Sequence, residues 1–307
     1  MEGEVEGDGI WGYTTPMGGP GAQPLLKGLK HILLLSPMAA TVDYNYSHIV
    51  IVADKSGSMS SMEDTPRLKL NEFIKEQQAQ PAQQPAQQAP SKVTFDCWAF
   101  NDHCDLLFEN KSGEEAVIHR DNLMTAGGTA LYGSLGHIID KTGEKLANLP
   151  EGQRPGRVII VIYTDGEENS SKAEYSGEMG RLLLKSKIEH QQSVYNWIFM
   201  FLGSNIDAIS NGTSIGISRQ TCLNYNSSER GYNAAFRSAS QAVDRFRTSE
   251  PSEDRDTVLK RVAFTEKDHE TNQMPSNSHM PSNMRMPSNM RMPSNAHMSR
   301  MGSTDIY

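Results

Sequence analysis

The sequence "HIVIVADKSGSMS", residues 48–60, joins a wholly apolar segment to a cluster of oxygen-bearing side chains. Residues 49–53 are apolar without alternation, which is typical of a strand buried on both faces of a parallel sheet. Asp54, Ser56 and Ser58 follow directly, so a carboxylate and two hydroxyls project from the point where this strand ends. Ligands of such sheets bind beyond the carboxyl ends of the strands. The stretch therefore predicts both a fold and a site.

The rest of the central region alternates between strand-like and helix-like segments. Further strand-like runs lie at residues 92–100, 104–109, 157–163, 195–202 and 221–225. Apolar residues at helical spacing predict helices that begin at Thr65 or extend over 130–149, 174–191 and 230–247. The short link "NDH" between the second and third strands predicts a hairpin. The expected fold is a three-layer α/β sandwich with a mostly parallel sheet and one antiparallel edge strand.

Composition divides the 307 residues into one domain and its extensions. Residues 1–43 are rich in Gly and Pro and are expected to be poorly ordered. The domain is placed at 44–250, with a Gln/Pro-rich insertion at 78–90. Residues 251–307 are expected to form a disordered tail that contains hexad repeats of the type MPSNxx. Proline in every unit of this repeat excludes a helix there.

Charge and cysteine content exclude several classes of protein. The formal net charge of −8 does not favour a nucleic-acid partner. The three cysteines include no CxxC pair, so they predict neither a disulfide framework nor a zinc site. No apolar run is long enough to span a membrane, and the run at 32–35 is too short for a signal peptide. We therefore expect a cytoplasmic protein without a membrane span.

Two further segments place oxygen donors near the first cluster. Asp165 follows another wholly apolar run, and Thr129 lies between two glycines and a predicted helix. Five side chains could thus share one ion: Asp54, Ser56, Ser58, Thr129 and Asp165. Carboxylate and hydroxyl oxygens favour Mg²⁺ or Mn²⁺ over zinc or copper. Two carboxylates balance the charge of a divalent ion, and one coordination position is expected to remain open to water or an outside carboxylate.

The same residues also have purely structural interpretations. The Asp-Ser-Ser turn could be capped by its own side chains. Thr129 could be the N-cap of the helix that follows it. Glu167 and Glu168 could add negative charge near the ion or form a solvated acidic loop. Gly127 and Gly128 are not followed by Lys, which excludes a P-loop, and they are expected to allow close backbone approach.

The motifs "DKSGSMS", "GGTALY" and "YTDG", in this order, resemble the metal-ion-dependent adhesion site (MIDAS) of the von Willebrand factor type A (vWA) domain, written DxSxS…T…D. The resemblance covers about residues 46–248, and the segments from residue 201 onward resemble a microbial and viral branch of the family. It implies a Rossmann-like fold. It also implies a set of metal ligands, with the hydroxyls bound directly and the aspartates bound directly or through water: Asp54, Ser56, Ser58, Thr129 and Asp165.

The resemblance implies a protein-binding module whose Mg²⁺ or Mn²⁺ accepts an Asp or Glu side chain from a partner protein. The partner could be an ATPase of the AAA type or another cellular assembly, as for some intracellular relatives. The alternative is a magnesium-dependent phosphatase or phosphotransferase of the haloacid-dehalogenase type, with Asp54 as nucleophile. Such sites need a general-acid aspartate two residues later, where this chain has Ser56. We therefore expect no enzymatic activity.

Overall fold

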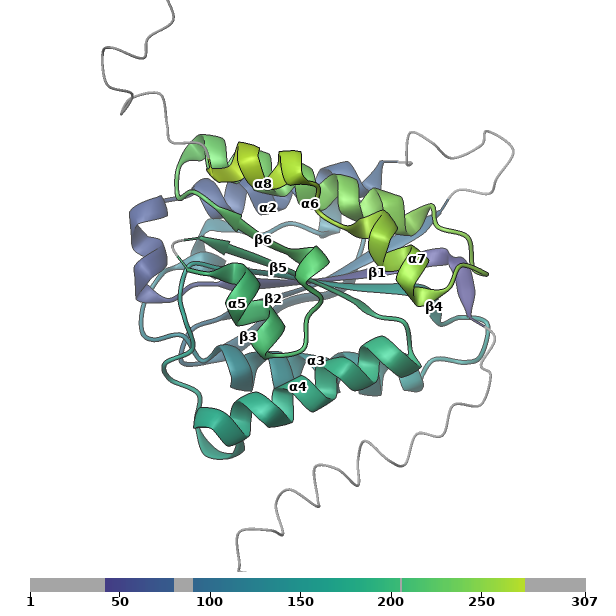
Figure 1. The fold of residues 1–307 in the computed structure, drawn as a ribbon, viewed down its shortest axis with the longest axis horizontal. Helices are drawn as coiled ribbons and strands as arrows, with labels where there is room; N and C mark the ends of the chain where they lie inside the picture. Colours follow the sequence, from purple (N-terminus) through teal and green to yellow (C-terminus); the bar gives the residue numbers. More distant parts are fainter. Residues whose placement is uncertain (1–41, 80–90, 205, 274–307) are drawn as a thin grey trace, which may run out of the picture. The chain divides into compact units, whose positions relative to one another are not determined.

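The computed structural model describes residues 42–79, 91–204 and 206–273, and its centre is a six-stranded sheet (Figure 1). The strands lie in the order β3-β2-β1-β4-β5-β6. Their bounds are β1 (Asp43–Asp54), β2 (Lys92–Phe100), β3 (Cys104–Lys111), β4 (Pro155–Thr164), β5 (Ile198–Ser204) and β6 (Cys222–Tyr225). Edge strand β3 pairs antiparallel with β2, and the other pairs are parallel. The predicted fold class is confirmed.

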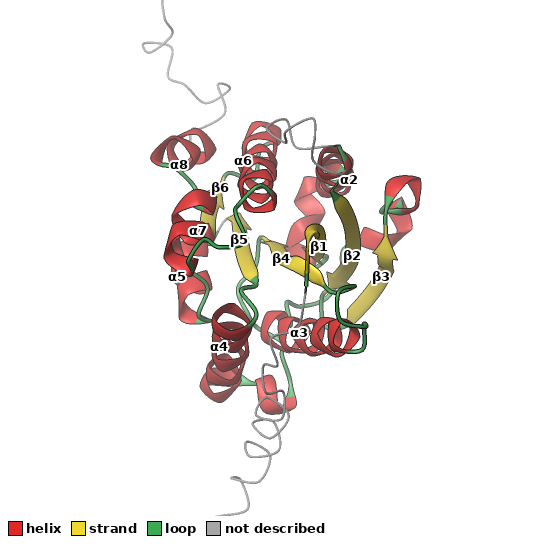
Figure 2. Cartoon of the chain, turned by 90° about the vertical axis from the view of Figure 1, so that its right-hand side faces the viewer, coloured by secondary structure: helices red, strands yellow, loops and turns green. Residues whose placement is uncertain are grey.

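Helices cover both faces of the sheet (Figure 2). One face carries α2 (Thr65–Gln78), α6 (Glu229–Arg247) and α8 (Glu266–Gln273). The other face carries α3 (Leu131–Ala147) and α4 (Gly177–Val194). Two short helices, α5 (Ala208–Ser214) and α7 (Arg255–Val262), lie beside the β5–β6 side of the sheet.

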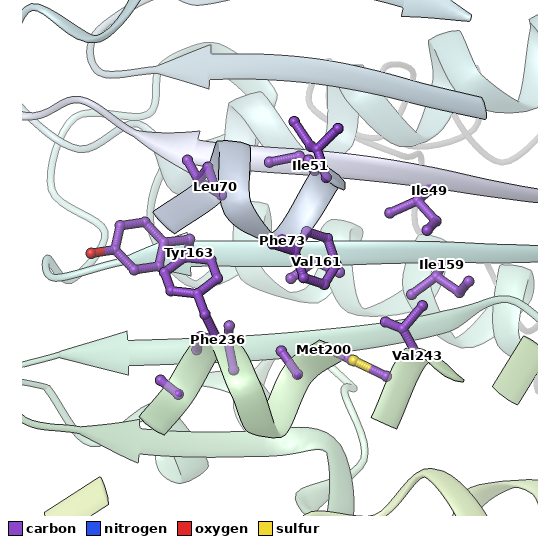
Figure 3. Packing of buried hydrophobic residues seen from close by; sticks show 14 of the residues in the cluster. Ile49, Ile51, Leu70, Phe73, Ile159, Val161, Tyr163, Met200, Phe236 and Val243 are labelled. Carbon is purple, nitrogen blue, oxygen red and sulfur yellow. The ribbon is translucent and has the colours of Figure 1, made fainter. Parts of the chain in front are cut away.

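Strand β1 separates two hydrophobic cores. Ile49 and Ile51 face the core formed with α2 and α6, whereas Val50 and Val52 face the core formed with α3 and α4. All four side chains are fully buried. Figure 3 shows the first core, where Tyr163 of β4 packs against α6. The absence of polar alternation in β1 therefore reflects burial on both faces.

The fold extends beyond residue 250, where the sequence analysis placed the end of the domain. Helices α7 and α8 pack against α6, and Val262 and Phe264 are buried in the same core as α2. Residues 251–273 thus belong to the fold rather than to the expected disordered tail. Their few apolar residues made this segment similar in composition to the tail. The expectations for the N-terminal extension, most of the Gln/Pro-rich insertion and the hexad repeats concern residues outside the described ranges.

Two other expectations can be compared with the structure. Cys97 and Cys222 lie inside strands, are buried, and form no disulfide. None of the helices in the described ranges is both long enough and apolar enough to cross a membrane.

Candidate metal centre

The candidate carboxylates lie where the strand order of the sheet reverses. The chain passes from β1 to β2 and β3 on one side, and then to β4 on the other side of β1. Asp54 ends β1 and Asp165 follows the end of β4, so both lie at the carboxyl ends of adjacent parallel strands. Thr164, the last residue of β4, donates a hydrogen bond from Oγ1 to Asp54 Oδ2 at 2.5 Å. Such reversal points are the usual ligand sites of α/β sheets.

Four of the five candidate residues form one continuous chain of hydrogen bonds. The amide of Ser56 donates to Asp54 Oδ1 at 2.7 Å. The hydroxyls of Ser56 and Ser58 lie 3.0 Å apart, and Ser58 Oγ donates to Asp165 Oδ1 at 2.6 Å. Asp54, Ser56 and Asp165 are buried, whereas Ser58 is exposed. The site is therefore accessible to solvent on the side of Ser58.

Thr129 reaches the same place from the loop that precedes α3. A Cβ atom added to Gly166 would lie 2.8 Å from Thr129 Oγ1 and 3.6 Å from Ser58 Oγ. Glycine at this position leaves a small space that is bordered by two hydroxyls. The structure therefore brings together all five residues that the sequence nominated as metal ligands.

Backbone contacts hold the loop before Thr129 against the segment that follows β1. The amide of Ala126 donates to the carbonyl of Lys55, and the amide of Gly57 donates to the carbonyl of Gly127, each at 3.0 Å. Gly127 has a φ of +77°, in the left-handed region that favours glycine. A Cβ atom there would lie 2.3 Å from Asp102 Oδ2. The left-handed backbone conformation and the nearby Asp102 side chain thus explain a glycine at position 127.

Glu168 caps the N-terminus of α3 and is not part of a solvated acidic loop. Its Oε2 atom accepts hydrogen bonds from the amide of Tyr132 at 2.8 Å and from Ser171 Oγ at 2.6 Å. Its Oε1 atom accepts from the amides of Ser170 and Ser171. A carboxylate at this end of a helix also interacts favourably with the helix dipole. Glu168 therefore positions the helix that follows Thr129.

Asn169 connects the same loop directly to a candidate ligand. Its side-chain Oδ1 atom accepts from the backbone amide of Thr129 at 2.8 Å. The backbone amide of Asn169 donates to the carbonyl of Thr129 at 3.1 Å. Sequence analysis missed Thr164 and Asn169 and left the role of Glu168 open. Asn169 lies 40 residues from Thr129 along the chain, and nothing in the local sequence indicates this contact.

Both carboxylates of the site are ionised less readily than ordinary aspartates. Burial raises the pKa of Asp54 to about 6; hydrogen bonds from Thr164 and Ser56 oppose this shift, and the negative charge of Asp165 adds to it. Burial also raises the pKa of Asp165. Across the described part of the chain, neither carboxylate lies within 4.0 Å of a Lys or Arg nitrogen, and neighbouring Lys55 pairs with Asp105 instead. A bound cation would compensate both buried charges.

The donor set fits a small, hard divalent ion. It contains two carboxylates and three hydroxyls, and these oxygens come from three distant segments. Both oxygens of Asp54 already accept hydrogen bonds, which favours contact with the ion through water. Within the described ranges, no three His, Cys, Asp or Glu side chains come together as a metal site. Oxygen donors of this kind suit Mg²⁺ or Mn²⁺.

No protein-family model and no curated protein matches this chain. Among solved structures, proximal thread matrix protein 1 from the mussel byssus, with a zinc-occupied MIDAS motif, is 16% identical, with 67% of this chain and 46% of that chain covered and a TM-score of 0.40. The ArnB paralog VWA2 from Sulfolobus acidocaldarius is 13% identical, with 62% and 44% covered and a TM-score of 0.40. The chain thus spans less than half the length of these proteins. Similarity at this level carries no argument about function.

Proposed function

We propose that this chain is a metal-dependent protein-binding module of the vWA type. Mg²⁺ or Mn²⁺ would be held by the five-residue set described above and would accept an Asp or Glu side chain from a partner protein. One observation carries this proposal: oxygen donors from three distant segments converge on two buried carboxylates that have no cation partner among the described residues. The sequence motif and the position at the reversal of strand order support it.

Each residue would have a distinct task in this module. Ser58 is the exposed member of the set, so a partner would approach from its side. Asp54 and Asp165 would balance the charge of the ion, and Thr129 would complete the set from the opposite loop. The bound ion would supply an electrophilic position that an outside carboxylate can fill. Affinity would then depend on both the metal and the charge of the partner.

The geometry around Asp54 favours binding over phosphoryl transfer. A nucleophilic aspartate must present an oxygen to its substrate, but the Asp54 side chain is almost inaccessible at 2% exposure. Its two oxygens accept hydrogen bonds from Ser56 and Thr164. Ser56 also stands where the phosphatase alternative requires a general acid, and a serine does not perform this task near neutral pH. We therefore propose that the chain acts by binding and not by catalysis.

Thermal unfolding with and without metal tests the site. The full-length chain should unfold at a higher temperature in Mg²⁺ or Mn²⁺ than in a chelator, because an ion that binds the native state stabilises it by about 2.7 kcal/mol at 100 times Kd. Asp54→Ala and Thr129→Ala should abolish this shift. Glu174→Ala, which removes an exposed carboxylate that takes no part in the hydrogen bonds of the site, should retain it. An equal shift in Asp54→Ala would refute the metal centre.

Partner capture tests the function of the site. Proteins retained by the immobilised chain in Mg²⁺ should elute with chelator, and the Asp54→Ala chain should not retain them. Replacement of the contacting acidic residue of a captured protein by its amide should abolish retention. The same preparations should not turn over a generic phosphate ester. Turnover that requires both Mg²⁺ and Asp54 would favour the phosphatase instead.

A further inference from the structure

A cavity of about 540 Å³ lies at the amino-terminal ends of β1, β4 and β5, the end of the sheet opposite to the candidate metal centre. The last turns of α3, α4 and α6 and the start of α7 complete its wall. Much of this wall is apolar, with contributions from Leu146, Val158, Val194, Trp197, Phe246 and Val258. Sites for small organic ligands have volumes of about 300–1,000 Å³ and are mostly apolar. In size and lining, this cavity resembles such a site.

Arg157 brings a buried positive charge into the cavity wall. Its side chain lines the cavity, and the residue is only 7% exposed. Its Nε atom donates to the carbonyl of Phe246 at 3.0 Å, and one terminal nitrogen, Nη2, donates to the carbonyl of Ser249. The other, Nη1, makes no hydrogen bond to any described residue. Carbonyl groups do not neutralise the charge, and a buried charge without a counter-ion is costly.

The carboxylates around the cavity, Glu250, Asp43 and Glu253, act on Arg157 only at longer range. Within the described ranges, no carboxylate lies within 4.0 Å of its guanidinium group. Glu253 also lines the cavity, but it is held by Arg261 at 2.6 Å. Glu151 and Glu250 are exposed, so their charges are solvated. An anion placed inside the cavity would meet a guanidinium that is in no direct ion pair with a described carboxylate.

Two more arginines add to this preference. Arg154 and Arg255 line the cavity and donate to backbone carbonyls, Arg154 to Ala147 at 2.8 Å and Arg255 to Gln192 at 2.6 Å. Neither is in an ion pair with a described residue. The cavity thus combines an apolar, aromatic lining with guanidinium groups that lack carboxylate partners.

We propose that this cavity binds a small amphipathic anion, namely an aliphatic carboxylic acid of medium chain length. Its alkyl chain would pack against Trp197 and Phe246, and its carboxylate would pair with Arg157. Planar guanidinium groups match carboxylates through paired hydrogen bonds. The free Nη1 atom of Arg157 supplies one of these donors. The site is distinct from the candidate metal centre and needs no divalent ion.

Calorimetric titration of the full-length chain in chelator tests this proposal. Decanoate should bind at least ten times more tightly than decanol, because only decanoate can neutralise Arg157. Arg157→Gln should remove most of the preference for decanoate over decanol and leave decanol binding unchanged. Arg237→Gln, which removes an exposed arginine of α6 outside the cavity, should bind both compounds as the natural chain does.

A second variant keeps the test decisive if Arg157→Gln does not fold. Val194→Trp places a large side chain at the end of α4, in the cavity wall, and should abolish binding of both compounds. Unchanged decanoate binding in this variant, or equal affinities for decanoate and decanol, would overturn the proposal. Failure of the full-length chain to bind decanoate at millimolar concentration would also overturn it.

Discussion

Two buried aspartates on neighbouring strands differ in how their charge is compensated. Asp54 of β1 is 2% exposed and Asp96 of β2 is 1% exposed. Burial would raise the pKa of Asp96, but hydrogen bonds and positive charge from His48 and Lys145 outweigh it and hold the pKa at about 2. Asp54 accepts hydrogen bonds only from neutral groups, and its pKa rises to about 6. Similar burial therefore gives opposite shifts.

The surroundings of Asp96 show how this chain satisfies a buried carboxylate internally. Asp96 Oδ1 accepts from the amide of Asn110 at 2.7 Å, and Oδ2 contacts Lys145 Nζ and lies 3.2 Å from His48 Nε2. Burial lowers the pKa of His48, and the hydrogen bond and negative charge of Asp96 oppose this shift. Thr94 completes the group by a contact of 2.9 Å with His48 Nδ1.

This difference supports different roles for the two carboxylates. A buried charge that lacks a partner destabilises the fold, and at Asp96 the chain avoids this cost. At Asp54 and Asp165, no Lys or Arg of the described residues compensates the negative charge. Lys55, the residue after Asp54, pairs with exposed Asp105 instead. Under the proposed function, the missing positive charge is supplied by the metal ion. The predictions that follow test this contrast, beginning with the largest expected effect.

Asp96→Asn should be the most damaging of these substitutions. It leaves the Lys145 ammonium facing a neutral amide in a buried network, and loss of one partner of such a pair costs about 3–5 kcal/mol. The free energy of unfolding, measured with urea in chelator at neutral pH, should fall by this amount. A loss below 1 kcal/mol would mean that Lys145 finds another partner, such as Glu109 at 3.8 Å.

The pH dependence of this loss follows from the direction of the pKa shift. The pKa of Asp96 is about 2 in the folded chain and about 3.8 in the unfolded chain. The unfolded state therefore binds more protons between these values, and stability from Asp96 is present above about pH 4. It is lost as the pH falls toward 2. The difference between the natural chain and Asp96→Asn should shrink over the same range in urea titrations at acid pH.

Asp54→Asn should increase the free energy of unfolding in the absence of metal, whereas Asp96→Asn decreases it. At pH 7.5 the substitution replaces a buried, uncompensated carboxylate by a neutral group of the same shape. The shift of the Asp54 pKa from 3.8 to about 6 corresponds to about 3 kcal/mol at most. Thr164 can still donate its hydroxyl to the carbonyl of Gly166, 3.1 Å away. In chelator, urea unfolding should show a gain of about 2 kcal/mol.

The same variant should gain nothing from added Mg²⁺, whereas the natural chain should be stabilised by it. Thr164→Val is the matched control for the hydrogen bond alone, because it removes the Thr164 donor and keeps the Asp54 charge. It should lower stability in chelator, since Asp54 then loses one of its donors. If Asp54→Asn is also less stable than the natural chain in chelator, Asp54 has a structural role and the contrast with Asp96 fails.

The sequence was sufficient to predict those parts of the fold and of the candidate site that depend on local patterns. The unbroken apolar run before Asp54 predicted a strand buried on both faces, and the motif around Ser56 and Ser58 identified oxygen donors at its end. Thr129 and Asp165 could be added because each lies next to a recognisable strand or helix end. The structure brings these residues together as the topology of a parallel α/β sheet requires.

The sequence was insufficient to predict contacts between residues that are far apart along the chain. Asp96 lies in a predicted strand, but its partners His48 and Lys145 are 48 and 49 residues away along the chain. The capping role of Glu168 depends on Tyr132, which is 36 residues away. Helices α7 and α8 were missed because each is short and contributes few apolar residues. Tertiary contacts, not local preference, determine these features.

Glu168→Gln should have an intermediate effect on both stability and metal binding. The glutamine has one acceptor oxygen in place of two, so either Tyr132 or the Ser170–Ser171 amides lose a partner. Loss of a helix cap costs about 1 kcal/mol. Because α3 begins at Leu131, two residues after Thr129, the apparent Kd for Mg²⁺ should rise about tenfold, as for other residues that orient metal ligands.

Equilibrium titration with Mg²⁺ and urea unfolding in chelator measure these two effects separately. Glu174→Gln is the matched control, because Glu174 is exposed and the amide of Tyr132 at the start of α3 donates to Glu168 instead. It should change neither quantity. If Glu168→Gln loses stability but binds Mg²⁺ with unchanged affinity, the cap serves the fold alone and does not position Thr129.

Asp105→Asn should have the smallest effect, although its ion pair is shorter than the contact between His48 and Asp96. Asp105 Oδ2 lies 2.6 Å from Lys55 Nζ, but the Asp105 side chain is 53% exposed. Water solvates Asp105 in the folded chain, although the Lys55 side chain is only 16% exposed, so this pair should contribute less than about 1 kcal/mol. The loss in urea unfolding should be within this limit and should vanish in 1 M NaCl, where screening is strong. A loss above 2 kcal/mol that persists in salt would show that burial is not what separates the three aspartates.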